Sequence, residues 1–168
     1  MSPRIRPPGS SRREGPGVGG GMEGLKVCHR RFAVSSAART ELRDLTEPVR
    51  EAIRELGIGA GIALVNTQHT TCALFVNEYQ GALLADLVGL MERLVPERAG
   101  YRHDDPRVSD CERGNAHAHL RAALLGRSLA LSVDDGEVVL GRYQSIIFAE
   151  LDGPRVREIA IQVVGGSS

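Results

Sequence analysis

The pattern that most restricts the fold lies in the C-terminal part of the chain, where four short apolar segments are separated by turn residues. Two of the turns carry Asp135-Gly136 and Gly153-Pro154, pairs that are typical of tight reversals of the chain. The segments are residues 129–133, 137–140, 144–151 and 156–164. Each has the length of a strand, so we expect an antiparallel sheet whose strands are joined by hairpins.

The rest of the chain adds both strands and helices. Residues 25–34 partly alternate between apolar and polar side chains, and residues 59–67 and 70–77 are β-branched and apolar, which predicts three further strands. Helices are predicted for residues 44–56, 80–94 and 115–125. Strands at both ends with helices inserted between them indicate an α+β fold rather than alternating βαβ units. A length of 168 residues favours a single domain, which we place at residues 25–168.

Composition limits the partners and the compartment. Residues 1–24 hold many of the glycines and prolines and few apolar side chains, so we expect a disordered N-terminal arm. The 21 basic and 21 acidic residues give a formal net charge of +0, which disfavours nucleic acid and membrane surfaces as partners. The three cysteines are widely spaced and form no CxxC pair, which favours a reducing, cytoplasmic location.

Two histidines lie in the predicted helix at residues 115–125. His117 and His119 are two residues apart, so they point to nearly opposite sides of a helix and cannot both face one site. His117 shares its side with Arg113 and Arg121, which is typical of a solvated surface, whereas His119 shares its side with Asn115. We therefore favour His119 as the functional histidine.

His69 and His103 are the natural companions of His119. His69 lies at the bend between two predicted strands, and His103 lies in the long polar loop of residues 96–114. Imidazoles from separate elements can converge on one metal ion or one phosphate. The alternative is structural: His69 satisfies a strand end and His103 is solvated.

Several other polar residues fit either a site or a structural role. Glu78 and Glu150 each end an apolar strand, where a carboxylate serves as metal ligand or general base or is simply solvated. Thr70 and Thr71 offer hydroxyls to a phosphate but are also ordinary sheet formers. Arg155 follows a turn and has the fork geometry that clamps a phosphate.

Two more candidates have a stronger structural interpretation. Cys72 is a nucleophile only if a base lies beside it, and it is otherwise a small buried apolar residue. Asp104 and Asp105 resemble a carboxylate pair for a cation, although adjacent acids in a loop are usually solvated.

Taken together, five segments of the chain resemble the YjbQ family, and the resemblance spans about residues 25 to 165. The segments are 69–78 (HTTCALFVNE), 101–105 (YRHDD), 115–120 (NAHAHL), 140–144 (LGRYQ) and 150–155 (ELDGPR). Two positions depart from the family pattern: Tyr143 stands where Trp is common, and Cys72 stands where Ala is common.

The resemblance implies an α+β fold with an antiparallel β-sandwich-like core and two or three helices, assembled as a homotrimer. Family members are often described as secondary thiamine-phosphate synthases, transferases that join a pyrimidine methyl diphosphate to a thiazole phosphate and release diphosphate. Mg²⁺ is expected to neutralise the diphosphate, and Zn²⁺ is the alternative ion at a histidine cluster. The partner would be a small phosphorylated metabolite.

The resemblance also implies roles for individual residues. His69, His103 and His119 would form the metal or diphosphate site, and His69, His119, Glu78 and Glu150 would be the catalytic set. The expected substrate-binding residues are Thr70, Thr71, Asn115, Gln144 and Arg155. Two other functions use the same residues: a metal-dependent hydrolase with Glu78 or Glu150 as base, and a noncatalytic protein that binds a phosphorylated metabolite or a metal.

Overall fold

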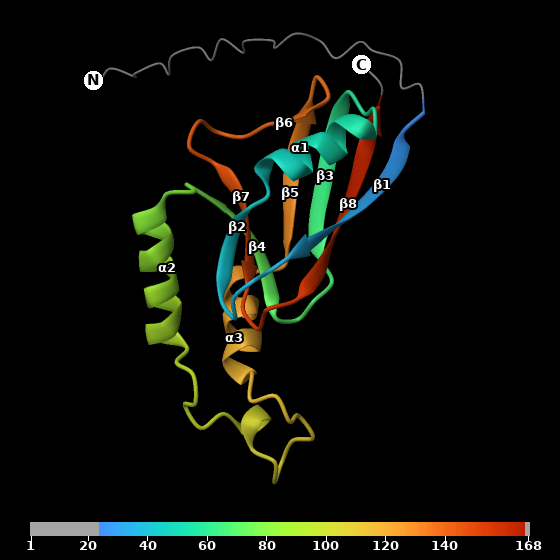
Figure 1. The fold of residues 1–168 in the computed structure, drawn as a ribbon. Coiled ribbons are helices and arrows are strands. Elements are labelled where there is room, and N and C mark those ends of the chain that lie inside the picture. The colour runs from blue at the N-terminus through green and yellow to red at the C-terminus, as the bar shows by residue number, and fades with distance from the viewer. Residues whose placement is uncertain (1–23, 167–168) are drawn as a thin grey trace, which may run out of the picture.

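The computed structural model describes residues 24–166, which form two antiparallel sheets with three α-helices (Figure 1). This confirms the predicted α+β fold with a sandwich-like core. The predicted disordered arm, residues 1–24, lies outside the described residues except for Gly24. None of the helices in residues 24–166 is long and apolar enough to cross a membrane.

The larger sheet has five strands in the order β1-β8-β3-β5-β6, and the smaller sheet has three in the order β2-β7-β4. All neighbouring strands are antiparallel. The larger sheet contains β1 (Lys26–Ser35), β3 (Ala60–Thr67), β5 (Ser128–Asp134), β6 (Glu137–Val138) and β8 (Val156–Gly166). The smaller sheet contains β2 (Glu41–Asp44), β4 (Cys72–Asn77) and β7 (Ser145–Glu150).

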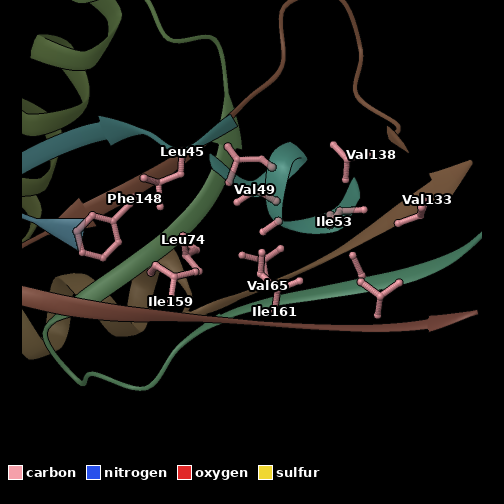
Figure 2. Close-up of a cluster of buried hydrophobic side chains, with 14 of the residues drawn as sticks. Leu45, Val49, Ile53, Val65, Leu74, Val133, Val138, Phe148, Ile159 and Ile161 are labelled. Carbon is pink, nitrogen blue, oxygen red and sulfur yellow. The ribbon is translucent and has the colours of Figure 1, made fainter. Parts of the chain in front are cut away.

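The main hydrophobic core lies between the two sheets and under the first helix (Figure 2). The core arises from the alternation of side chains along the strands. In strand β8, every second side chain from Arg157 to Val163 points inward and is buried. Ile159 and Ile161 meet Leu74 and Phe148 of the smaller sheet, and all four are at most 1% exposed. This burial fixes the register of the strands, since a slip by one residue would turn every apolar side chain outward.

Helix α1 (Thr46–Glu55) closes one end of this core with Val49 and Ile53, both 0% exposed. Its start is fixed by Asp44, whose carboxylate accepts hydrogen bonds from the backbone N–H and the hydroxyl of Thr46 at 2.8 and 2.5 Å. The helix is followed by Gly57 at φ +63°, a conformation that favours glycine.

Helices α2 (Gly81–Leu94) and α3 (Ala116–Leu125) lie on the other face of the smaller sheet (Figure 1). Ala118 and Ala122 of α3 pack there with Met91 of α2, around Ala73 and Ala149 of the sheet. Both faces of the smaller sheet are therefore covered. A short 3-10 turn (Arg102–Asp104) lies in the long connection between the two helices.

Two features of the sheets differ from expectation. The turn at Asp135-Gly136 does make the β5–β6 hairpin, but Gly153-Pro154 does not join neighbouring strands, because β7 and β8 belong to different sheets. The turn residues indicate a reversal but not the sheet in which the next strand pairs. Strand β2 was not predicted, since its four residues, Glu-Leu-Arg-Asp, carry only one apolar side chain.

Candidate functional site

A cleft of about 340 Å³ lies where the chain crosses twice between the two sheets. One crossing runs from β3 to β4 through residues 68–71, and the other runs from β7 to β8 through residues 151–155; both lie near α3 in Figure 1. We call this the histidine cleft. Its lining residues are Gln68, His69, Thr70, Thr71, Cys111, Arg113, Asn115, His119, Asp152 and Arg157.

His119 and His103 form a pair beside this cleft. Their ring centroids are 4.9 Å apart and the rings are tilted by 44°. Burial lowers the pKa of His119, and the charge of His103 lowers it further, while Asp152 and Asp104 act in the opposite direction. The helix periodicity therefore indicated correctly that His119, and not His117, faces the cleft. The loop of residues 96–114 supplies His103 as its neighbour.

His69 also lines the histidine cleft. Its Nε2 accepts a hydrogen bond from the backbone N–H of Glu158 at 3.2 Å. The hydrogen bond extends the sheet pairing beyond Thr67, the last residue of β3. His69 thus gives a backbone N–H at the end of the strand pairing a hydrogen-bond partner, and it still contributes to the wall of the cleft.

The three histidines do not form a metal site. Within residues 24–166, no group of three or more His, Cys, Asp or Glu side chains is arranged to hold a metal ion. The Nε2 of His69 is occupied by a backbone N–H, and His103 and His119 face each other ring to ring. The chemistry of this donor set therefore does not fit a resident Zn²⁺, which needs three or four converging ligands.

Asp152 organises the polar floor of the cleft, although sequence reasoning did not select it. Its carboxylate accepts a hydrogen bond from Asn115 Nδ2 at 2.9 Å and lies 3.4 Å from Arg155 Nη2 and 3.9 Å from Arg113 Nη1. Arg155 also donates from Nε to the Asp152 carbonyl at 2.9 Å, which folds its guanidinium back onto the turn. Arg113 keeps the freer charge, since its side chain is 60% exposed.

Glu150 is fully buried and paired with Arg157, not solvated at a strand end as one interpretation had it. Arg157 donates from Nε and Nη2 to the two carboxylate oxygens at 2.6 and 2.7 Å, and its Nη2 also contacts Thr71 Oγ1 at 3.0 Å. Glu150 additionally accepts the backbone N–H groups of Leu151 and Asp152.

The electrostatics of this pair argue against catalysis by Glu150. Burial alone would raise the pKa of Glu150, but the hydrogen bonds from Arg157 and the backbone outweigh it, so the pKa is lowered. A carboxylate held in this way is a weak base, and we assign it a positioning role. Arg157 was missed, yet it occupies an inward position in the apolar alternation of β8, which is the sequence signal of a buried charge.

Cys72 is a buried residue and not a nucleophile. It pairs with Glu150 across the β4–β7 ladder, and its Sγ lies 3.8 Å from both carboxylate oxygens. Burial, followed by the charge of Glu150, raises the pKa of the thiol to about 12. The thiol therefore stays protonated near neutral pH.

Glu78 and Gln144 lie at the opposite end of the smaller sheet from the histidine cleft. In the β4–β7 ladder Cys72 pairs with Glu150, whereas Asn77, which precedes Glu78, pairs with Ser145. At about 3.3 Å per residue, Glu78 is roughly 20 Å from the Cys72 end. Gln144 accepts the N–H of Gly141 at 2.8 Å instead of lining the cleft.

His117 and Arg121 contradict the prediction of a solvated helix face. They are 1% and 2% exposed, because residues 95–97 pack over this side of α3. Arg121 Nε donates to the Val95 carbonyl at 3.0 Å, and His117 Nε2 lies 3.2 Å from Glu97 Oε1. The prediction assumed that only one side of the helix is covered, whereas both sides are.

Comparison with known families agrees with this architecture. The family described as UPF0047 protein YjbQ-like matches residues 30–166. A UPF0047 protein of Archaeoglobus fulgidus is 40% identical over 133 residues, which cover 79% of this chain and 98% of the relative. The UPF0047 protein YugU of Bacillus subtilis is 33% identical over 132 residues, covering 79% of this chain and 96% of the relative.

Solved structures show the same fold. A YbjQ-like protein of unknown function from Sulfolobus solfataricus aligns with a TM-score of 0.77 at 34% identity, covering 84% of this chain and 99% of its own. A hypothetical protein from Aeropyrum pernix aligns with a TM-score of 0.74 at 33% identity, covering 82% and 98%.

Proposed function

Because the chain belongs to the UPF0047 family of YjbQ-like proteins, we propose that its histidine cleft binds phosphate-bearing metabolites and performs a thiamine-phosphate synthase-like transfer. In this reaction a pyrimidine methyl diphosphate is joined to a thiazole phosphate. The observation that supports it best is the His103–His119 pair, 4.9 Å between ring centroids, beside a cleft that also holds Arg113. Such a group of nitrogen donors suits an anionic oxygen ligand.

The proposed step breaks the bond between the pyrimidine methylene carbon and the diphosphate oxygen, and the electron pair leaves with the oxygen. The thiazole nitrogen then supplies its lone pair to form the new C–N bond, so no proton is gained or lost. In the free protein His119 favours its neutral form, because burial and His103 disfavour its charge. A diphosphate beside the pair reverses this balance, and the protonated imidazoles then neutralise the leaving group.

The remaining residues of the histidine cleft position the substrate or hold the residues that contact it. Thr70 lies exposed at the edge of the cleft, and its hydroxyl is available to the substrate. Asn115 and Arg155 hold Asp152. Arg157, which is itself bound by Glu150, donates a hydrogen bond to the Thr71 hydroxyl. A divalent ion such as Mg²⁺ would enter with the diphosphate as part of the substrate, since residues 24–166 supply no group of three ligands for a resident ion.

The hydrolase alternative lacks support at its general base. Glu150 is tied to Arg157 and Glu78 lies at the far end of the smaller sheet, so neither carboxylate is placed to activate a water in the cleft. Binding of a phosphorylated metabolite without turnover is the remaining alternative, and the assay below separates it. We also propose a cytoplasmic location, which agrees with the three free cysteines.

The test is formation of thiamine phosphate from the two purified substrates with Mg²⁺. We expect product from the wild type and a loss of about a hundredfold in rate for His119→Ala, because the leaving group loses a cation. His29→Ala is the matched control, since His29 is exposed on β1 outside the cleft lining, and it should keep the wild-type rate. Diphosphate binding without product from the wild type would leave only the noncatalytic alternative.

A further inference from the structure

A second and larger cleft lies under the loop of residues 96–114. It has a volume of about 550 Å³ and shares Arg113 with the histidine cleft. We call it the loop cleft. Its charged lining consists of four arginines and three carboxylates: Arg39, Arg98, Arg107, Arg113, Glu97, Asp104 and Asp105.

The carboxylates of the loop cleft already have partners. Asp105 is bound by Arg107, with Nη2 2.7 Å from Oδ2, and Asp104 accepts the backbone N–H of Ala116 at 2.9 Å. Arg98, by contrast, forms no ion pair or side-chain hydrogen bond with any residue in 24–166. The lining therefore has a surplus of positive charge.

Next to Glu97 lie two buried side chains, Arg121 and His117, that have nitrogens without a hydrogen-bond partner. Arg121 is 2% exposed and always charged, yet its Nη2 has no hydrogen-bond partner among the described residues. Both ring nitrogens of His117 also lack one, although Nε2 is 3.2 Å from Glu97 Oε1. A buried guanidinium without a counter-anion is costly, so this arrangement favours the entry of an anion.

Glu97 separates this buried pair from the loop cleft. Its side chain is 44% exposed and lies between His117 and Arg39, whose Nε is 3.7 Å from the same carboxylate oxygen. The contact between the Glu97 carboxylate and His117 is not a hydrogen bond, since both ring nitrogens of His117 lack a hydrogen-bond partner. Glu97 is therefore the partner that an incoming anion would displace.

We propose that the loop cleft binds the phosphate group of a small metabolite, at a site separate from the histidine cleft. Arg39 and Arg98 contact the phosphate at the mouth, and Glu97 turns outward so that the phosphate reaches His117 and Arg121. Several converging donors suit the three oxygens of a phosphate better than the two of a carboxylate. The phosphate site in the loop cleft does not depend on the proposed function. Only the further step, in which the two clefts hold the two substrates of one reaction, rests on the proposed function.

The test is titration of the full chain with inorganic phosphate in a calorimeter, in the His119→Ala background that removes binding at the histidine cleft. We expect one site to remain. On that background Arg98→Gln should weaken phosphate binding about tenfold, and Glu97→Gln should strengthen it about fivefold, because the competing carboxylate is gone.

Two controls carry the same changes of charge outside both clefts. Arg142 lies in the loop after β6, and Glu92 lies on the exposed side of α2. Arg142→Gln and Glu92→Gln should therefore leave the affinity for phosphate unchanged. Where His119→Ala melts below the wild type, His119→Gln replaces it as the background.

Two results would overturn the phosphate site. One is the absence of phosphate binding in a His119 variant that melts as the wild type does. The other is that Arg98→Gln and Glu97→Gln behave like their controls. If instead His119→Ala leaves the phosphate binding of the wild type unaltered while Arg98→Gln and Glu97→Gln act as expected, the loop cleft stands and the proposed function loses its support.

Discussion

At the scale of single residues, the buried Glu150–Arg157 pair is the strongest constraint on the site. Glu150 is 0% exposed and receives two hydrogen bonds from Arg157 and two from the backbone, so every oxygen of the carboxylate is engaged. Through its contact with Thr71, Arg157 also fixes the wall of the histidine cleft. The Glu150–Arg157 pair acts by holding the polar residues of the histidine cleft in place.

Removing one partner of this pair should destabilise the protein strongly. Glu150→Gln leaves the Arg157 guanidinium buried without its counter-charge, and we expect the free energy of unfolding to fall by about 3–5 kcal/mol. Glu158→Gln is the control, because its ion pair with Arg31 is exposed and should contribute less than about 1 kcal/mol. Urea denaturation measures both values, and equal losses in the two variants would contradict the structural role of Glu150.

Residue by residue, sequence reasoning succeeded where one element decides the outcome. Helix periodicity placed His119 and Asn115 at the cleft, because their positions depend only on the turn of α3. It failed for His117, since the cover over that side comes from residues 95–97 of another element. Asp152 was also missed, because its partners come from segments far away in the sequence.

At the scale of elements, the two crossings between the sheets build the histidine cleft. The crossing from β7 to β8 is crowded at Gly153, where a Cβ atom would collide with the Ala38 carbonyl oxygen and lie 2.7 Å from Ser36 Oγ. The N–H of Gly153 also donates to the Arg39 carbonyl at 2.9 Å. This turn is therefore clamped against the segment between β1 and β2.

Gly153→Ala should loosen this crossing. The added methyl group has no room, so we expect a loss of about 1–3 kcal/mol in unfolding free energy and weaker substrate binding in the adjacent cleft. Gly81→Ala is the control, because nothing lies within 4 Å of the added atom at the start of α2. Thermal melting measures both variants, and an unchanged melting temperature for Gly153→Ala would show that the turn is not clamped.

The strands and helices themselves were largely predictable, because they follow from periodicity, turn residues and length. The three helices lie within two residues of the expected bounds at each end. The allocation of β7 to the smaller sheet was not predictable, because Gly153-Pro154 specifies a local turn, whereas pairing with β2 and β4 depends on residues at least 68 positions away.

At the scale of the whole molecule, apolar side chains remain exposed on two surfaces of the single chain. Ile62 is 60% exposed and Leu64 is 41% exposed on the outer face of the larger sheet, beside Val27 at 50%. Leu90 and Leu94 of α2 are 46% and 65% exposed. Such surfaces favour contact with further copies of the chain.

We propose a homotrimer on this basis and on the family resemblance. Light scattering should give three times the chain mass of 18.1 kDa. Ile62→Glu and Leu90→Glu test which face is the contact, and at least one of them should reduce the mass to that of one chain. Val108→Glu is the control, since Val108 is 57% exposed but lies in the loop before α3, outside both surfaces. A single-chain mass for the wild type would rule out the trimer.

The most direct test of the central claim follows the titration of His119 by NMR, with and without inorganic pyrophosphate. In the free protein its pKa lies below the ordinary value of 6.5 because of burial and the neighbouring His103. A pyrophosphate bound between the imidazoles favours their charged forms, so the pKa of His119 should rise above 6.5 and the affinity should increase as the pH falls through that value. A His119 pKa that stays low at saturating pyrophosphate would contradict the claim that this histidine pair holds the leaving group.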